Sequence, residues 1–330
     1  MPRVEPEQLV LFDVGPNMSK IREASAALKR RTRAPQTHVA YECDWRAFSA
    51  WCTSTGRPAL PASAETLALY AAARLQPVAG VRRLRASTVE RHVAAIAFRH
   101  RAEGAPVPDR AEARAIIEGA RRQRLEQPRQ RLALTVAMVR KIAARLVRAG
   151  TAEAARTRAL LALGIGTGLR RSNLVALDLA DVSFASRKGV LVRVRQSKTD
   201  QTGRGRVIGV FRGAREETCP VRCVRAWLAF RGLEPGPLFT RIREHGPTLG
   251  RLGAEWVNQE VKAAVRLIGV APAGYGAHSM RAGFVTAAHN CGTDVLGIME
   301  VTGHKSAEMV RRYLRNADPF GAPNPLARAL

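Results

Sequence analysis

The chain has 330 residues, which is enough for two domains that each bury a hydrophobic core. Its 54 Lys and Arg outnumber 27 Asp and Glu, so the formal net charge at pH 7 is +27. This charge is far from that of a typical cytosolic enzyme and predicts a polyanionic partner, most commonly nucleic acid, rather than a merely solubilising excess of charge.

The first 120 residues are predicted to form a small helical domain after a flexible leader over residues 1–18. Tyr41, Trp45, Phe48 and Cys52 fall at steps of four, three and four, which places them on one face of a helix. We interpret this aromatic stripe as part of a core, and a base-stacking platform is the alternative.

Three further helices are indicated in this domain. One starts at residues 61–65 and another spans residues 111–120. Between them, residues 87–90 match a capping box ahead of an apolar stripe. The opposite face of that helix carries four basic side chains, Arg91, His92, Arg99 and His100. This face is predicted either to lie against a DNA backbone or to be an ordinary solvated face.

Residues 121–133 are predicted to be a basic linker, because proline and concentrated charge interrupt the hydrophobic periodicity there. Amphipathic helices are expected after it, over residues 134–146 and 154–163. The glycines of residues 164–168 lack the spacing of a dinucleotide-binding loop and follow no strand. We predict that they form a tight turn ahead of the next helix.

Residues 189–211 are the one clear β region. Valines at positions 190, 192 and 194 alternate with other side chains, and a second strand is predicted over residues 207–211. Lys198 is placed where the first strand runs into the turn, and helices are expected again from about Val221 to the end. The predicted fold class is mainly α, with an N-terminal helical domain followed by a mixed, mostly α domain that contains a small antiparallel β-sheet.

The five cysteines are scattered and odd in number, which argues against a disulfide framework and favours a reducing compartment. Cys219 and Cys223 lack a second Cys or His pair at zinc-finger spacing, so a helix start at Cys219 and Pro220 is favoured over a metal site. No signal peptide opens the chain, and the longest apolar run, residues 159–169, is too short to span a bilayer. We expect a soluble, cytoplasmic protein with no membrane partner.

A candidate site for phosphoryl transfer lies near the C-terminal end. His304 belongs to the stretch 303–306, Tyr313 follows nine positions later, and the stretch 278–281 with His278 and Arg281 precedes both. A tyrosine hydroxyl is a poor nucleophile at neutral pH because its pKa is about 10, and nearby cations would make it usable. The pattern therefore predicts phosphoryl transfer by a tyrosine.

The ordered set of motifs resembles a tyrosine site-specific recombinase of the phage integrase family. The matching residues are Thr167-Gly168-Leu169-Arg170, Lys198, His278-Ser279-Met280-Arg281, Gly303-His304 and Tyr313. The resemblance covers about residues 19–315. It implies a SAM-like helical core-binding domain that binds DNA over residues 19–120, a catalytic domain over residues 134–315 and a C-terminal tail over residues 316–330.

Six catalytic residues are implied: Arg170, Lys198, His278, Arg281, His304 and Tyr313. Tyr313 would attack the scissile DNA phosphate and leave a 3′-phosphotyrosyl link that stores the bond energy without ATP. Arg170 and Arg281 would bind the extra negative charge of the five-coordinate phosphorus, because a guanidinium is a permanently charged planar fork.

The remaining roles also follow from the resemblance. His278 would assist proton transfer at the nucleophile and contact the phosphate, and His304 would donate a further hydrogen bond to a phosphate oxygen. Lys198 would be the general acid for the departing 5′ oxygen. No metal or other cofactor is expected, because cationic side chains would neutralise the charge that metal ions otherwise carry.

The implied partner is double-stranded DNA with specific recombination sites. The family exchanges strands as a homo-tetramer through a Holliday junction, with accessory proteins in some systems. Two alternatives stay open: a monomeric type IB topoisomerase with a similar residue set, and a non-catalytic DNA-binding protein derived from a recombinase. The sequence does not disclose the target site, nor does it separate integration, excision, dimer resolution and transposition.

Two features depart from the family pattern or leave it open. Asn173, three residues after Arg170, occupies a position that is usually acidic, so it can accept a hydrogen bond but brings no negative charge. The tail over residues 316–330 is short and contains three prolines, so the way it would dock on a neighbouring protomer is not evident from the sequence.

Overall fold

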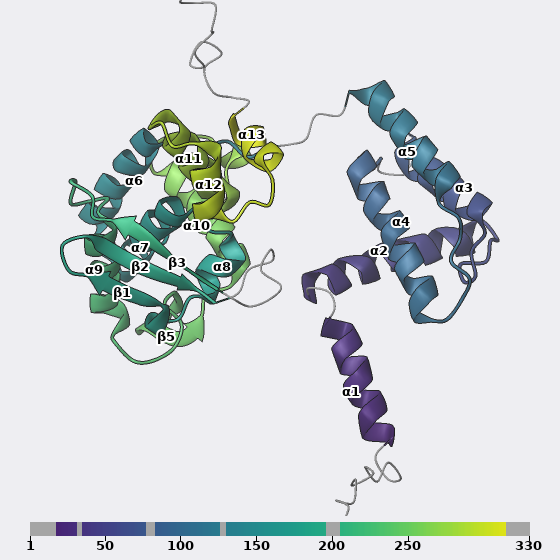
Figure 1. Ribbon diagram of the computed structural model, residues 1–330, viewed down its shortest axis with the longest axis horizontal. Helices are drawn as coiled ribbons and strands as arrows, with labels where there is room; N and C mark the ends of the chain where they lie inside the picture. Colours follow the sequence, from purple (N-terminus) through teal and green to yellow (C-terminus); the bar gives the residue numbers. More distant parts are fainter. Residues whose placement is uncertain (1–17, 32–34, 77–82, 126–129, 196–204, 315–330) are drawn as a thin grey trace, which may run out of the picture. The chain divides into compact units, whose positions relative to one another are not determined.

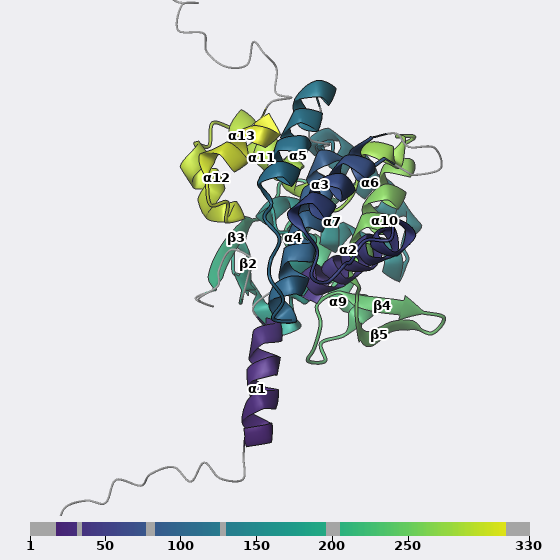
Figure 2. The ribbon, with the colours of Figure 1, turned by 90° about the vertical axis from the view of Figure 1, so that its right-hand side faces the viewer.

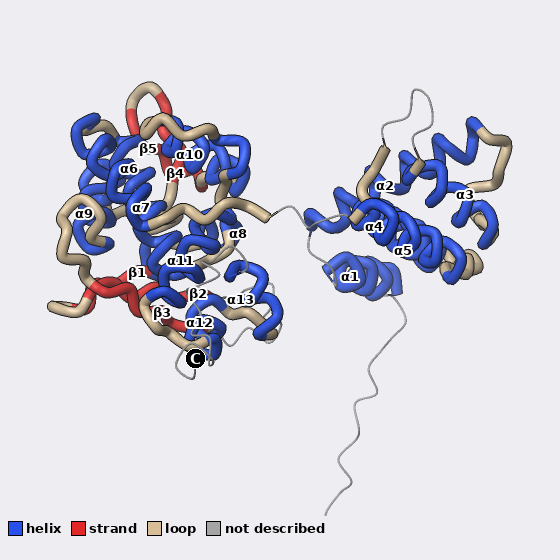
Figure 3. The backbone as a smooth tube through the Cα atoms, turned by 90° about the horizontal axis from the view of Figure 1, so that it is seen from above, coloured by secondary structure: helices blue, strands red, loops and turns tan. Residues whose placement is uncertain are grey.

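The computed structural model describes residues 18–31, 35–76, 83–125, 130–195 and 205–314 (Figure 1). The chain divides into two compact units, Met1–Pro128 and Arg129–Leu330. Helices make up most of both units, and the strands in the described residues belong to the second unit (Figure 3). The predicted class, mainly α with small antiparallel sheets, is confirmed.

The helices of the first unit are α1 (Met18–Arg31), α2 (Pro35–Ser54), α3 (Ala64–Leu75), α4 (Ala86–Ala102) and α5 (Ala111–Arg124). Its core is built around Phe48 and Tyr70, whose rings meet edge to face with centroids 5.0 Å apart. Ser63 caps α3, because its hydroxyl accepts the Thr66 N–H at 3.0 Å. The start predicted for this helix is therefore confirmed.

Two boundaries in the first unit differ from those predicted. Helix α4 begins at Ala86 with Arg85 at its N-cap and no side-chain cap, so Ser87 lies inside the helix and the capping-box prediction is wrong. Ala86 is fully buried, so packing against the core sets this helix start. Helix α5 continues to Arg124, and residues 121–124, assigned to the linker from their charge, are helical.

The helices of the second unit are α6 (Val136–Ala149), α7 (Ala152–Thr167), α8 (Arg171–Ala176), α9 (Pro220–Arg231), α10 (Ala254–Arg266), α11 (His278–Asn290), α12 (Val295–Thr302) and α13 (Ala307–Leu314), with short 3-10 turns η1 (Leu179–Asp181) and η2 (Pro272–Gly274). Its strands are β1 (Val182–Ala185), β2 (Gly189–Val194), β3 (Arg206–Phe211), β4 (Thr240–Arg243) and β5 (Gly246–Arg251). Helices α11 to α13 and the β4–β5 hairpin lie at opposite ends of this unit (Figure 2).

Strands β1, β2 and β3 form one antiparallel sheet in that order. Val192 of β2 lies opposite Val182 and Ile208, and the inward valines at 190, 192 and 194 are buried as the alternation predicts. The β4–β5 hairpin was not predicted, so the expectation of helices alone after Val221 is wrong. The exposure of β5 shows no alternation, so the hairpin has no period-two pattern to reveal it in the sequence.

The glycines of residues 164–168 pack helices closely rather than forming a turn. Helix α7 continues through Gly164 and Gly166 to Thr167, so the predicted tight turn is wrong for these two positions. A Cβ on Gly164 would lie 2.5 Å from the Met280 sulfur of α11, and one on Gly166 would overlap Val210 of β3. Only Gly168, with φ +59°, ends the helix in the left-handed conformation.

Two other predictions concern Cys219 and the membrane. Cys219 is the N-cap of α9 and Pro220 its first residue, so the predicted helix start is confirmed. Among the described helices, none has both the length and the apolar character that crossing a bilayer requires.

The packing role of Gly166 predicts that G166A destabilises the protein by about 1–3 kcal/mol, because Val210 is stiff and cannot move aside without strain. G119A is the matched control, because Gly119 is exposed within α5 and an added Cβ meets nothing within 4 Å. That variant should be neutral or up to about 1 kcal/mol more stable. Urea unfolding of the full chain checks both values, and equal effects of the two substitutions would contradict the packing argument.

Candidate active site

Five of the six predicted site residues come together in the second unit. Arg170 is the N-cap of α8, His278 and Arg281 share one face of the first turn of α11, His304 follows the end of α12, and Tyr313 lies in α13. Lys198 lies outside the described residues. Hydrogen bonds and electrostatic interactions thus join pieces of chain that are separate in the sequence at helices α11 and α13.

Arg281 is the centre of this group and is 1 % exposed. Its Nη1 donates to the Gly168 carbonyl at 2.6 Å and to the Thr302 carbonyl at 2.8 Å. Its Nε donates to His304 Nε2 at 3.2 Å. One guanidinium therefore ties the end of α7 and the end of α12 to α11, which fixes its orientation.

The hydrogen bonds of His304 assign its tautomer. Thr302 Oγ1 donates to the Ile298 carbonyl at 2.6 Å, so it accepts the Nδ1–H of His304 at 2.7 Å. His304 Nε2 then holds a lone pair and accepts from Arg281. The expected hydrogen bond from His304 to a phosphate oxygen is not available in this state, because Nε2 has no proton to donate. His304 instead orients Arg281.

Tyr313 is paired with a histidine. Its hydroxyl lies 2.7 Å from His278 Nε2, and the ring centroids of Tyr313 and His304 are 5.5 Å apart. His278 remains exposed to solvent although protein atoms crowd its ring. A neutral imidazole at this distance can accept the hydroxyl proton.

The surroundings of the two histidines keep them neutral. Desolvation, followed by the positive charges of Arg281, Arg170 and Arg131, lowers the pKa of His278. Burial is also the main cause that lowers the pKa of His304 to about 3, with Arg281 and Arg170 next. Both rings are therefore predominantly uncharged at pH 7.

Arg281 itself feels the same crowding of positive charge. Burial and then Arg170 lower the pKa of Arg281 to about 10, so it stays protonated at pH 7. Its Nη2 is buried and has no hydrogen-bond partner among the described residues. A buried unpaired donor is costly, and a charged one more so. An anionic oxygen would satisfy this atom, and a phosphate fits the surrounding cations.

Two residues of the site were missed from the sequence. Thr302 is fully buried and holds both His304 and, through its carbonyl, Arg281, but a single threonine carries no sequence signal. Arg131 was assigned to the linker from its charge. Its guanidinium donates to the Ala273 carbonyl at 3.2 Å, and its charge acts on His278. The end of the predicted linker thus borders the site.

Asn173 is buried in α8 and lines a cavity of about 440 Å³ together with Asp181 and Arg195. Arg195 ends β2 and donates to Asp181 at 2.7 Å, and it also pairs with Asp178 at 2.9 Å. Carboxylates therefore lie close to the position where the family usually has an acidic residue. Both carboxylates, those of Asp178 and Asp181, already pair with Arg195.

The histidines on the predicted basic face of α4 belong to the core. His92 and His100 are 5 % and 0 % exposed. His92 Nε2 pairs with Asp44 at 3.1 Å and Nδ1 accepts the Tyr70 hydroxyl at 2.8 Å. The prediction that these histidines face DNA or solvent is wrong, because the helix is turned so that both rings satisfy buried polar groups.

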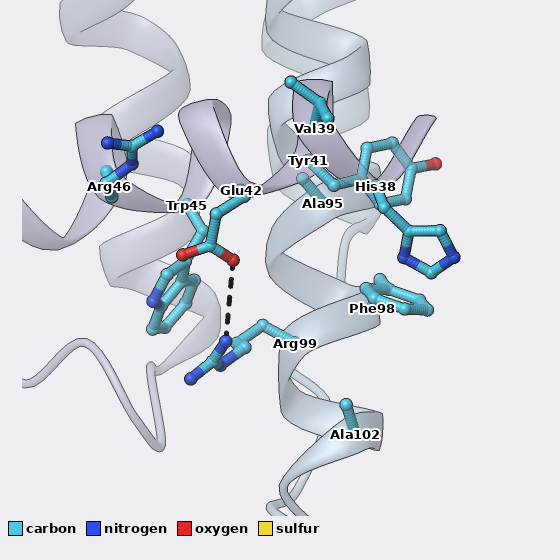
Figure 4. A pocket seen from close by; sticks show the side chains of 10 residues that line it. All are labelled: His38, Val39, Tyr41, Glu42, Trp45, Arg46, Ala95, Phe98, Arg99 and Ala102. Carbon is cyan, nitrogen blue, oxygen red and sulfur yellow. Dashed lines mark ion pairs between the residues drawn. The ribbon is translucent and has the colours of Figure 1, made fainter. Parts of the chain in front are cut away.

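The arginines on that face are paired with acids. Arg91 binds Asp44 with two hydrogen bonds of 2.7 and 2.9 Å, and Arg99 pairs with Glu42 (Figure 4). The Arg99–Glu42 ion pair borders a cavity of about 450 Å³, where Tyr41 and Trp45 are half-buried. The core interpretation of the aromatic stripe is therefore confirmed for Phe48 and Cys52 but is incomplete for its first two members.

Cys219 and Cys223 are buried free thiols. In the described part of the chain, no group of three or more His, Cys, Asp or Glu side chains is arranged to hold a metal ion.

Comparison with known proteins gives consistent matches. Residues 133–319 match the profile of the Phage integrase family. An "Integrase/recombinase xerD homolog" of Selenomonas ruminantium is 34% identical over 90% of this chain and 87% of its own length. "Recombinase cre" of Escherichia phage P1 is 23% identical over 83% of this chain and 82% of its own. A Tn1549 transposon integrase solved with transposon right end DNA superimposes with a TM-score of 0.60 at 17% identity, over 93% of this chain and 97% of that one.

The low pKa of His304 predicts a pH-dependent loss of stability. Between about pH 6.5 and 3 the unfolded chain binds a proton at His304 that the folded chain does not, so folding stability falls as the pH falls through this window. H304Q removes this titration. Between pH 7 and 4.5 the parent protein should lose about 2 kcal/mol more stability than H304Q.

Urea unfolding at a series of pH values measures this difference. H245Q is the control for the loss of a histidine, because His245 is exposed in the turn between β4 and β5. Parallel stability curves for the parent protein and H304Q would show that His304 is not held neutral by the fold.

Proposed function

The chain belongs to the phage integrase family of tyrosine recombinases, and we propose that it cuts and rejoins double-stranded DNA at specific sites through a 3′-phosphotyrosyl intermediate. The observation that carries this proposal is the buried guanidinium of Arg281, whose Nη2 forms no hydrogen bond within the described residues and whose charge acts on Tyr313, Arg170 and His278. A DNA phosphate would supply the missing acceptor. Relatives named as recombinases and integrases support the same reaction.

In the proposed first step, Tyr313 attacks the scissile phosphorus. His278 Nε2, 2.7 Å from the hydroxyl, takes its proton as the new oxygen–phosphorus bond forms. The bond to the 5′ oxygen breaks, and Lys198 is proposed to protonate that oxygen. Attack by a 5′ hydroxyl of the partner strand reverses these steps and releases Tyr313, so no external energy source enters the cycle.

The arginines stabilise the transition state. Arg281 forms three hydrogen bonds to the described residues before any substrate arrives, and its Nη2 is proposed to bind a phosphate oxygen. The Arg170 side chain does not cap α8 and forms no ion pair with the described residues, so its guanidinium is also proposed to bind a phosphate oxygen. Preorganised donors of this kind lower the barrier because they need no rearrangement when charge develops. The proposal therefore assigns charge neutralisation to side chains and includes no metal.

The proposed assembly is a tetramer that exchanges strands through a Holliday junction. A cavity of about 450 Å³ in the second unit offers an apolar docking surface between α6, α7, β3, α11 and α12, with Val139, Ile165, Val210, Phe284 and Val301 in its lining. The proposed occupant is the tail of a second copy, because residues 316–330 include Phe320, Leu326 and Leu330. Accessory proteins and a mobile-element setting are compatible with this assembly.

Covalent cleavage is predicted to depend on Tyr313. With a nicked suicide substrate carrying the recombination site, the parent protein should form a covalent protein–DNA adduct and Y313F should form none. Y275F is the matched control, because Tyr275 is buried in the core of the same unit and its hydroxyl, among the described residues, donates only to the Met138 sulfur, at 3.7 Å. Adduct formation is measured by denaturing gel electrophoresis.

The result distinguishes the alternatives. No adduct with the parent protein, together with salt-sensitive specific binding, would indicate a non-catalytic DNA-binding protein. An adduct formed equally by Y313F would refute Tyr313 as the nucleophile. Relaxation of supercoiled plasmid that lacks the site, by a monomer, would indicate a topoisomerase.

If the tail of one copy docks on another, removing this contact should impair tetramer assembly but leave DNA cleavage at a single site intact. A protein that ends at Asp318, and the variant A288Q in the cavity, should keep single-site cleavage but lose at least about tenfold in recombination and in tetramer formed on paired sites. The reason is that an added polar side chain removes the apolar surface the tail would cover. A144Q, at an exposed position of α6, is the control. Tetramer formation is measured by sedimentation on DNA, and normal tetramers in both altered proteins would contradict this docking mode.

A further inference from the structure

Arg206, the first residue of β3, contacts the turn that carries His304. Its Nη1 donates to the Glu300 carbonyl in the last turn of α12 at 3.2 Å. The guanidinium lies against Gly303, where a Cβ would overlap Nη1. Gly303 has φ +69° and ends α12. A larger residue at 303 would therefore be strained and would also displace Arg206.

The end of α12 is a place where a cation is stabilising. The last carbonyls of a helix lack partners within the helix and carry partial negative charge. Gly303 N–H satisfies the Met299 carbonyl at 2.7 Å, and Arg206 satisfies the next one, that of Glu300. Arg206 thus fixes the position at which the chain leaves α12 and enters His304.

The position of this turn decides how His304 meets Arg281. Thr302 and His304 lie on either side of Gly303, and both contact Arg281, Thr302 through its carbonyl at 2.8 Å and His304 through Nε2 at 3.2 Å. A shift of the turn would move two of the three acceptors that orient the Arg281 guanidinium. Arg206 therefore acts on the phosphate site although it is not one of the six residues assigned to it.

The positive charge of Arg206 also helps His304 to accept the hydrogen bond from Arg281. Burial is the main cause that lowers the pKa of His304, followed by the charges of Arg281, Arg170 and His278. The nearby charge of Arg206 lowers this pKa further. A neutral His304 keeps the lone pair on Nε2 that accepts from Arg281. Arg281 feels Arg206 as well, as a further cause that lowers its pKa.

We propose that Arg206 is a positioning residue for DNA cleavage, which anchors β3 to the Gly303–His304 turn and so holds His304 as the acceptor that orients Arg281. The inference rests on the proposed function and deepens it. It also means that Arg206, the second residue after the segment 196–204 that contains Lys198, is tied to the turn that carries His304.

The test compares R206M with the parent protein. Methionine keeps the length of the apolar stem but removes the charge and the donors. Single-turnover formation of the Tyr313 adduct at saturating protein should slow by about ten- to a hundredfold, while the dissociation constant for DNA changes by less than about threefold. R206K keeps the charge and one donor, so it should recover part of the rate.

A double-mutant cycle with H304Q shows whether Arg206 acts through His304. In the H304Q background, R206M should cause less than about a threefold further loss, because the residue it positions is gone.

R193A is the matched control, because Arg193 is exposed on the neighbouring β2 and lies opposite Val207 in the sheet. It should cleave at the parent rate. Full cleavage by R206M, an equal loss in both backgrounds, or a loss confined to DNA affinity would each overturn the proposal. If R206M does not fold, the comparison of R206K with the parent protein in both backgrounds decides the same question. Failure of the parent protein to form a Tyr313 adduct would instead refute the proposed function.

Discussion

The buried guanidinium of Arg281 is the interaction on which the arrangement of the candidate site depends. It is almost completely removed from solvent, and its hydrogen bonds reach Gly168 at the end of α7, Thr302 at the end of α12 and His304 beyond it. None of these acceptors is a carboxylate, so the positive charge is solvated by dipoles but not neutralised. Burying a charge without a counterion is costly. The site therefore keeps an electrostatic preference for an anion that the described residues do not supply.

The same preference explains the state of the neighbouring histidines. Burial and the arginines around them favour uncharged rings, so His278 can accept a proton from Tyr313 and His304 can accept a hydrogen bond from Arg281. A carboxylate in this cluster would relieve the repulsion but would compete with a phosphate for Arg281. The acids near Asn173 are instead paired with Arg195 and Arg251. The cluster of positive charges thus lowers the stability of the folded protein at the place where a phosphate is proposed to bind.

The first unit uses its charges differently. Asp44 joins Arg91 and His92, and His92 continues to Tyr70, so a chain of polar contacts runs into the core. Most of what the sequence shows as a basic face is therefore used to hold α2 and α4 together. A high net charge shows that a polyanion is attracted, but it does not show which arginines meet it.

The sequence by itself determined the features that depend on neighbours along the chain. Period-two valines, the helix start at Cys219 and Pro220, and the three-residue spacing of His278 and Arg281 are local patterns, and the structure has each of them. Tertiary structure decided the features that depend on contacts between distant segments. Gly164 and Gly166 are helical because α11 and β3 need the space, His92 and His100 are buried because α4 turns them inward, and the proton on His304 is placed by Thr302 and Arg281. The physical reason is that packing, burial and electrostatics act through space, whereas helix and strand periodicity act along the chain.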